Sequence, residues 1–512
     1  MRIRKFIMII ALAIFVPVSA FSQSIYDAVR YSSLNYEGTA RSLAMGNAMT
    51  AAGPDLGAIS INPAAGGMFT KSEFTFTPAF TFDHTSSEYG PEINGTNTRF
   101  GIANIGWMSS SKTNNIGSFT HINFGITANK TANFNSKMSA FRTESNSNRM
   151  SSIASSTNGI TQSELDANSA YNNLPWESVL AWDAQLINTL PDSNDNFFAF
   201  TENLDDFTGS IYQAGAVNQY YNKEISGYMM DYDFNLSGDI NSRLFFGINL
   251  KIRSVYYKHT EYYSEEAVDQ SKFDSGLINY NYISTLKTNG SMATLQAGLI
   301  FVPTNNLKVG ASVTIPSYFS LNDKWHDSME GNFQDPNMNY SAYSPQGDYD
   351  YRVTTPLRYS FGASYILFDR AIISIDYEGA DYSNIKLKND EGDEYTYNAD
   401  NVAISNTFKA INNLRIGGEI KINQQLAIRG GYSHYSSSEN GYDGKLDFAS
   451  FGLGYSENNF RLDIAYQYQI NTVKDSYRLY SDYGSIDDPI YAPTLTEKYN
   501  TDKLLITVAF TF

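Results

Sequence analysis

The last nine residues, Leu504-Leu505-Ile506-Thr507-Val508-Ala509-Phe510-Thr511-Phe512, decide how this chain folds. Bulky apolar side chains occupy every second position from Leu504 to Phe512, and the positions between them include Thr507 and Thr511. A period of two residues is what a β-strand needs when one of its faces is apolar. The chain therefore ends in a β-strand, with an aromatic residue as its last residue.

The same alternation recurs upstream. Between Phe460 and Ile470, apolar residues alternate with polar ones such as Arg461 and Asp463. A similar stretch begins at Leu244. Any antiparallel sheet with one wet face gives this pattern. However, strands of about ten residues also suit a tilted crossing of the lipid bilayer.

The lengths of the connections favour the bilayer. Short connections lie near residues 109–115, 238–241, 303–306, 369, 423–424 and 457–459. Long ones alternate with them, near residues 84–97, 131–221, 263–281, 317–350, 383–407, 435–445 and 471–501. Tight turns on one rim and long loops on the other are typical of outer-membrane barrels. The sequence thus predicts an all-β fold, a transmembrane antiparallel β-barrel of about 14 strands.

An even strand number requires one choice. Residues 401–409 are interpreted as a short loop helix leading into a strand at 411–422, because a further strand there would make the number odd.

The N-terminus predicts export. Arg2, Arg4 and Lys5 precede the apolar run from Phe6 to Val18, and small residues follow at the cleavage positions in Ala20-Phe21-Ser22. This pattern predicts a signal peptide over residues 1–22, and the apolar run is too short to span a bilayer. With the predicted barrel, it implies the outer membrane of a Gram-negative cell.

Composition excludes several classes of protein. The chain has 512 residues, no cysteine and a formal net charge of −17. A disulfide scaffold is excluded, and a nucleic-acid partner is not expected of an acidic chain without basic clusters. No nucleophile motif or phosphate loop stands out, so we expect no enzyme and no cofactor.

A run of small residues lies between the signal and the first strand. It comprises Gly38-Thr39-Ala40-Arg41-Ser42-Leu43-Ala44-Met45-Gly46-Asn47-Ala48 and, further on, Asn62-Pro63-Ala64-Ala65-Gly66-Gly67. It has too much Gly and Pro for a regular helix and lacks the period of a strand. A barrel of 14 strands is too wide for side chains alone to fill. We therefore expect residues 23–70 to plug the lumen as a hatch and residues 71–512 to form the barrel.

These residues carry a resemblance to a known family. The segment from Gly38 to Asn47, Ala51-Ala52-Gly53-Pro54-Asp55 and the Asn62-Pro63-Ala64-Ala65-Gly66 motif resemble the FadL family, outer-membrane transporters of long-chain fatty acids and aromatic hydrocarbons. The hairpin from Gly298 to Ala311 is similar in style. The likeness covers nearly the whole mature chain.

The resemblance implies a mechanism. A small hydrophobic substrate would land between extracellular loops, move to a pocket above the hatch and leave sideways through a kinked strand into outer-membrane lipid, without energy coupling. Asn62, Pro63 and Ala64 would position the hatch, and Gly46 and Gly66 would permit its tight turns. The protein would be a monomer. The C-terminal strand ending at Phe512 would be recognised by the barrel-assembly machinery, unless it is a simple edge strand.

Charged residues are expected on the inward faces of late strands, where they would satisfy hatch backbone groups or line a hydrated wall. They are Arg415, Glu419, Lys421, Arg429, Arg461 and Asp463.

The long loop at 131–221 contains apolar residues whose spacing suits one helix face. They are Trp176, Val179, Leu180, Leu186, Ile187 and Leu190. One hypothesis is a lipophilic landing surface for substrate, and the other is a helix packed on neighbouring loops as a lid. The loop is longer than the resemblance would suggest.

No metal site is predicted. The five histidines, His84, His121, His259, His326 and His434, show no metal-ligand spacing. The stretch from Asp192 to Asn196 lacks the Gly and Glu of a calcium loop and is interpreted as a polar turn. Two rival functions stay open, a haem-binding receptor and a non-conducting structural or adhesion barrel.

Overall fold

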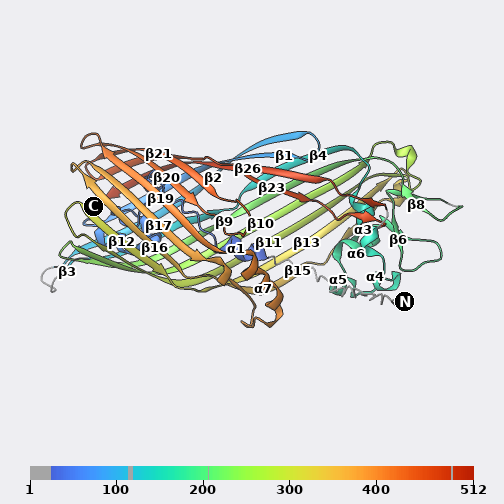
Figure 1. Cartoon of the computed structure of the whole chain (residues 1–512), viewed down its shortest axis with the longest axis horizontal. Coiled ribbons are helices and arrows are strands. Elements are labelled where there is room, and N and C mark those ends of the chain that lie inside the picture. Colours follow the sequence, from blue (N-terminus) through green and yellow to red (C-terminus); the bar gives the residue numbers. More distant parts are fainter. Residues whose placement is uncertain (1–24, 114–118, 206, 486–487) are drawn as a thin grey trace, which may run out of the picture.

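A computed structural model of the chain describes residues 25–113, 119–205, 207–485 and 488–512. The predicted signal peptide lies outside the described residues, as does part of the predicted turn at 109–115. Figure 1 shows a long barrel with tight turns at one end and helices and loops at the other.

The barrel closes where the first strand meets the last. Strand β1 (Glu73–Glu88) pairs antiparallel with β2 (Glu92–Lys112) on one side and with β26 (Thr494–Thr511) on the other. The predicted antiparallel barrel of 14 strands is therefore confirmed. The wall continues through β3 (Phe119–Asn133), β9 (Val217–Ile240), β10 (Leu244–Ala267), β11 (Leu277–Phe301), β12 (Leu307–Thr314), β13 (Tyr318–Phe333), β15 (Gly347–Thr354), β16 (Arg358–Leu367), β17 (Ala371–Asp381), β19 (Ala410–Lys421), β20 (Leu426–Tyr435), β21 (Leu446–Glu457) and β22 (Phe460–Gln469).

Several wall strands are interrupted and resume in register. Strands β12 and β13 both pair with β11, so together they count as one strand of the wall. On their other side, β16 pairs with β12 and β15 pairs with β13, so β15 and β16 together form the next strand of the wall. Further extensions and hairpins are β4 (Ser136–Ser145), β14 (Tyr340–Tyr343), β18 (Lys386–Asn389), β23 (Val473–Arg478), β24 (Tyr483–Gly484) and β25 (Pro489–Ile490). Short 3₁₀ turns are η3 (Gln270–Lys272), η4 (Pro336–Met338), η5 (Tyr382–Asn384) and η6 (Tyr395–Tyr397).

The two faces of the wall differ in polarity. Outward side chains such as Leu250 and Phe451 are 47% and 64% exposed, whereas their inward neighbours Asn249 and Ser450 are buried. An apolar outer face with a polar inner face is the pattern of a barrel surrounded by lipid. Among the described residues, no helix is long and apolar enough to cross a membrane.

The rim of the barrel is oblique. Strands β9, β10 and β11 have 24, 24 and 25 residues, whereas β16, β20 and β22 have 10 each. The short strands stop near mid-length, where α7 projects, and the long ones continue to the helical end (Figure 1).

Several predicted long loops are therefore wrong. The connections at 317–350 and 471–501 are more than half strand, through β13, β14 and β15 in the first and β23, β24, β25 and β26 in the second. Strands β1 and β2 are joined by residues 89–91, and β10 and β11 continue to Ala267 and from Leu277, so the connections at 84–97 and 263–281 are mainly strand. Backbone pairing continues outside the bilayer with polar side chains on both faces, as at the consecutive residues His84 and Thr85 of β1. The predicted loop helix at 401–409 is confirmed as α7 (Asn398–Thr407), which leads into β19.

The N-terminal segment lies inside the barrel. It consists of α1 (Ile25–Ser32), α2 (Ala40–Ala44), η1 (Ala58–Ser60) and η2 (Pro63–Met68) and precedes β1. Positions 36–67 are buried almost throughout, with Arg41 and Pro54 as the exceptions. We call residues 25–70 the hatch.

A separate unit covers the long-strand end. Residues 146–205 and 207–216, here called the lid, form α3 (Arg149–Thr157), α4 (Gln162–Leu165), α5 (Ala170–Asn173), α6 (Trp176–Asp183), β5 (Ile187–Thr189), β6 (Phe197–Ala199), β7 (Glu202–Leu204) and β8 (Ile211–Gln213). The lid shares an apolar core with the ends of β10, β11 and β13, through Tyr263, Tyr280 and Phe333.

Candidate functional site

Glycines in the wall let the hatch backbone approach the strands closely. A Cβ atom on Gly298 of β11 would lie 1.9 Å from Asn62 Oδ1, and one on Gly417 of β19 would lie 2.2 Å from the Met45 carbonyl oxygen. Real Cβ atoms do not come so close to other heavy atoms. The hatch is thus fitted to this barrel wall and packs against it directly.

Asn62 connects two parts of the hatch. Its Nδ2 donates to the Thr50 carbonyl at 2.7 Å, and its Oδ1 accepts from the Ala64 N–H at 3.0 Å. The second bond caps η2, in which Pro63 occupies a first-turn position that needs no N–H. The Pro63 carbonyl accepts from Asn235 Nδ2 of β9 at 3.1 Å. The Asn62-Pro63-Ala64 motif is therefore a structural joint between hatch and wall.

The two predicted hatch glycines have different roles. Gly46 adopts a φ of 61°, a conformation that glycine accepts readily, and its carbonyl accepts from Ser433 Oγ at 2.8 Å. Gly66 lies within η2, where a Cβ would meet Asn235 Oδ1 at 2.2 Å. Gly46 thus lies in a turn with a positive φ, and Gly66 packs closely against β9.

Most of the wall side chains that donate to hatch carbonyls are neutral and polar, whereas charged residues were expected either to take this role or to line a hydrated wall. Asn249 donates to Ile59 at 2.9 Å, and Ser312 donates to Ile61 at 2.8 Å. Other donors to hatch carbonyls are Asn123, Gln296 and Ser364. Their signal in the sequence is an amide or hydroxyl at the inward position of a strand.

The predicted inward charges mainly pair with one another. Arg429 lies 2.6 Å from Glu419 and 2.7 Å from Asp463, and Arg461 lies 3.0 Å from Asp463. Arg415 contacts the hatch at the Asn47 carbonyl, 3.4 Å away, and at the Tyr36 ring, and Glu419 contacts it at Arg41, 2.8 Å away.

Lys421 is an exception to the predicted inward set. It is exposed at the end of β19, beyond the hatch, because the strand has already reached the open rim.

The wall has a seam between β2 and β3. Pairing of these strands ends at Asn104 and Asn129, and residues 92–103 of β2 pair with β1 alone. Just beyond, the β3–β9 register shifts between Lys130 and Ala132. We call the unpaired stretch between residues 92–103 and 130–133 the seam.

The hatch takes the place of β2 at the seam. The Asn35 N–H donates to the Thr131 carbonyl at 2.7 Å, and the Glu37 N–H donates to the Lys130 carbonyl at 3.0 Å. These carbonyls would otherwise lack a strand partner, which is costly inside a membrane protein. The hatch therefore completes the wall where β3 is irregular.

Charged side chains lie beside the seam. The Lys130 Nζ is 2.9 Å from the place of a Cβ on Gly101 of β2, so the glycine leaves room for it. Lys130 pairs with the buried Glu37 at 3.4 Å, and Glu37 also pairs with Lys503 of β26 at 3.1 Å. The Glu37 carboxylate of the hatch thus binds to β3 and to β26, the two strands that flank the β1–β2 hairpin.

A cavity of about 450 Å³ lies next to the seam. One side is the hatch, with Val29 and Leu34, and another is β3, with Ala132 beside the seam. Aromatic and aliphatic side chains cover much of the remaining surface: Phe134, Tyr382, Phe408, Ile411, Tyr435, Leu446 and Phe448. The volume and lining suit a small, largely apolar molecule.

Four of the six predicted landing residues belong to the lid core. Val179, Leu180, Leu186 and Ile187 are buried, whereas Trp176 and Leu190 are half-buried. The Trp176 ring lies 5.7 Å from that of Trp325 on β13. This arrangement fits the lid hypothesis, and a landing role would require the lid to open.

Four of the five histidines contact separate carboxylates. His84 lies 3.6 Å from Asp502, His259 lies 3.2 Å from Glu261, and His121 lies 3.1 Å from Asp239. His434 lies 2.7 Å from Asp447. Within the described ranges, no three His, Asp or Glu side chains are placed to hold a metal ion.

The stretch from Asp192 to Asn196 forms a turn. Ser193 Oγ accepts from the N–H groups of Asp195 and Asn196 at 3.3 and 3.0 Å. This agrees with the interpretation as a polar turn.

Comparisons with known proteins place the fold. No protein-family model matches the chain, and no curated protein matches its sequence. Among solved structures, a Pseudomonas aeruginosa FadL homologue matches with a TM-score of 0.53 and 14% identity, over 94% of this chain and 99% of that one. The toluene transporters TodX of Pseudomonas putida and TbuX of Ralstonia pickettii each match with a TM-score of 0.49, at 12% and 13% identity. The matches cover 94% and 93% of this chain, and 100% and 99% of those chains. This chain, a barrel closed around its own N-terminal segment, thus has the fold of a FadL homologue, as the sequence resemblance predicted.

Proposed function

We propose that this protein lets small hydrophobic molecules, long-chain fatty acids or aromatic hydrocarbons, cross the outer membrane by passive diffusion. The observation that carries the proposal is the cavity between the hatch and the seam. Apolar and aromatic side chains supply much of its lining, beside polar ones such as Asn133 and Lys503. It touches the wall at Ala132, where the pairing between β2 and β3 has ended. The FadL-type fold supports the same function.

The route follows from the position of the cavity. A molecule reaches it from the extracellular side, and the hatch beneath it blocks passage along the barrel axis. The seam offers the other way out, sideways into lipid. Asn35 and Glu37 of the hatch bond the edge of β3 at this point, so a shift of the hatch would free the seam. Asn62, Pro63, Ala64, Gly46 and Gly66 hold the rest of the hatch against the wall while the segment at Asn35 and Glu37 moves.

Export and assembly belong to the same proposal. The signal peptide directs the chain to the periplasm, and the strand ending at Phe512 is the recognition element for the barrel-assembly machinery. Phe512 is 66% exposed on the outer face, and its N–H donates to the Ser72 carbonyl at 3.0 Å. The barrel functions as a monomer.

The lid residues Trp176 to Leu190 contribute a landing surface when the lid is open. Deletion of this stretch should abolish uptake of an apolar substrate while the barrel still assembles. Normal uptake by the deletion variant would contradict a landing role.

Uptake into proteoliposomes tests the proposal. Purified protein is reconstituted, and the entry of labelled oleate and labelled toluene is timed against protein-free vesicles. Ala132→Trp fills the cavity from β3. Ala449→Trp, on the outer face of β21, is the matched control.

We expect faster uptake of at least one probe by the wild type and by Ala449→Trp, and loss of that increase in Ala132→Trp. Folding of each variant is checked by its heat-modifiable mobility on a gel. Wild-type uptake no faster than that of empty vesicles would favour a structural or adhesion barrel and overturn the proposal.

A further inference from the structure

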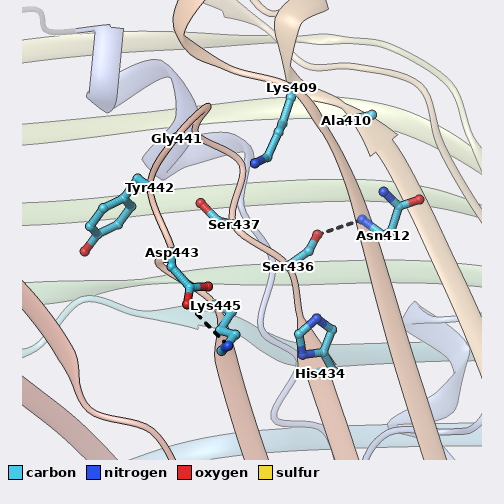
Figure 2. A pocket seen from close by; sticks show the side chains of 10 residues that line it. All are labelled: Lys409, Ala410, Asn412, His434, Ser436, Ser437, Gly441, Tyr442, Asp443 and Lys445. Carbon is cyan, nitrogen blue, oxygen red and sulfur yellow. Dashed lines mark hydrogen bonds and ion pairs between the residues drawn. The ribbon is translucent and has the colours of Figure 1, made fainter.

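A second pocket opens on the outer face of the barrel, on the low side of the rim. It encloses about 400 Å³ and is formed by the tops of β19 and β20 and by the loop from Ser436 to Lys445. Figure 2 shows Lys409, Asn412, His434, Ser436 and Lys445 around it. None of these residues belongs to the hatch or to the seam, although Ser436 also lines the cavity beside the seam.

The pocket lies directly above the apolar band. On β19, outward-facing Leu414 and Ile416 are 37% and 40% exposed, and the next outward residue is Asn412. On β20, outward-facing Tyr432 is followed by His434. Tyrosines near this level direct their hydroxyl groups away from the apolar band. Tyr432 donates to Asp447 at 2.7 Å, and Tyr377 donates to Asn412 at 2.6 Å. Such tyrosines mark the membrane interface, so the pocket is level with lipid headgroups.

The pocket offers hydrogen-bond donors without partners in the protein. The Lys409 ammonium is half-buried and forms no ion pair or hydrogen bond within the described part of the chain. The Asn412 side chain uses its oxygen as an acceptor from Tyr377, which leaves its N–H groups free among the described contacts. Ser436 Oγ accepts from the Asn412 N–H at 2.8 Å, so its own O–H is available to donate.

The carboxylates near the pocket do not neutralise its lysines or occupy its hydrogen-bond donors. Asp443 lies 3.3 Å from Lys445, but its side chain is 80% exposed, so the pair is weak and open to exchange. Asp447 is engaged by His434 at 2.7 Å and by Tyr432. Two ammonium groups, an amide and a hydroxyl group therefore surround the pocket on a chain whose net charge is −17.

We propose that this pocket binds the phosphate-bearing headgroup of an acyl lipid in the outer leaflet of the membrane. Lys409 and Lys445 supply the positive charge, and Asn412 and Ser436 donate hydrogen bonds to phosphate oxygens. The acyl chains then lie along the apolar band beneath, over Leu414 and Ile416. The proposal concerns the outer wall and does not depend on transport through the lumen.

Native mass spectrometry of the intact detergent-solubilised barrel tests this site. Diphosphoryl lipid A, its fully dephosphorylated form and phosphatidylcholine are titrated in turn as probes. The test variant is Lys409→Gln with Lys445→Gln. Lys421→Gln is the control, because Lys421 is exposed at the end of β19 that lies farthest from the pocket.

We expect the wild type and Lys421→Gln to retain diphosphoryl lipid A at least tenfold better than dephosphorylated lipid A and at least tenfold better than phosphatidylcholine. The double variant should lose that preference. Equal retention of the phosphorylated and dephosphorylated forms by the wild type would overturn the proposal, and so would unchanged retention by the double variant. Oleate and inorganic phosphate are added as competitors. Displacement of lipid A by either one at equal concentration would assign the site to a free anion and overturn the lipid proposal.

Discussion

The backbone N–H of Asn35 in the hatch donates a 2.7 Å hydrogen bond to the carbonyl of Thr131 in the wall, beside the point where β2 and β3 stop pairing. In an unbroken barrel this carbonyl would accept from the neighbouring strand. Here the hatch supplies the hydrogen-bond donor. Movement of the hatch and exposure of the seam are therefore linked, because each backbone partner lost by the hatch leaves a wall carbonyl unsatisfied.

A pair of adjacent glycines tests how tightly the hatch fits. Gly417→Ala should displace the hatch, because the new Cβ would lie 2.2 Å from the Met45 carbonyl oxygen. Gly418→Ala is the control on the same strand, since its Cβ would make an ordinary 3.6 Å contact with the Ile372 carbonyl. We expect a larger single-channel ion conductance in planar bilayers for Gly417→Ala only. The same low conductance in both variants would argue against close hatch–wall packing at Met45.

The Glu37 carboxylate should make the hatch sensitive to acid. Burial raises the pKa of this carboxyl, but Lys503 and Lys130 lower it by more, so the pKa lies below its ordinary value. Folding thus lowers the pKa. The pairing stabilises the hatch fully above the unfolded-state pKa of about 4.3. This contribution is lost as the pH falls through the folded-state pKa.

Hydrogen exchange measured at several pH values checks this. In the wild type, the amides of residues 35–37 should lose protection from exchange as the pH is lowered below about 4. Glu37→Gln has no carboxyl at this position, so its protection should be weak throughout and should not change over this pH range. Identical pH profiles for the two proteins would show that Glu37 does not anchor the hatch.

The lid should unfold separately from the barrel. Leu180 is fully buried in the lid core, so Leu180→Ala should destabilise the lid by about 2–5 kcal/mol. Leu190 is half-buried, and Leu190→Ala is expected to cost much less. Limited proteolysis should cut Leu180→Ala faster within residues 146–216, while the barrel keeps its heat-modifiable mobility. Loss of barrel assembly in Leu180→Ala would contradict an independent lid.

The strands were predictable because alternation is a local property. The pattern from Phe460 to Ile470 follows from the requirement that one face meet lipid and the other a polar lumen. The hatch was predictable in outline for a similar reason, since the small residues between Gly38 and Gly67 suit only a crowded interior. Outside the lipid this constraint disappears, so the continuation of β1 and β2 past His84 was mistaken for a loop.

The site itself depends on residues that only the closed barrel brings together. Asn35 and Thr131 are far apart in the sequence, and neither has an unusual local pattern. The cavity likewise combines Leu34 of the hatch with Ala132 and Phe448 of distant strands. The glycine at 298 could have been predicted as a close contact, but not its partner Asn62.

Reversible locking of the hatch tests hatch-gated passage most directly. The chain has no cysteine, so Asn35→Cys with Thr131→Cys introduces the only thiols, at positions whose backbones are hydrogen-bonded. Uptake of labelled oleate and toluene is measured in the oxidised and the reduced state, with each single variant as a control. Our account predicts that the disulfide stops uptake and that reduction restores it. Equal uptake in the oxidised and reduced states would contradict it.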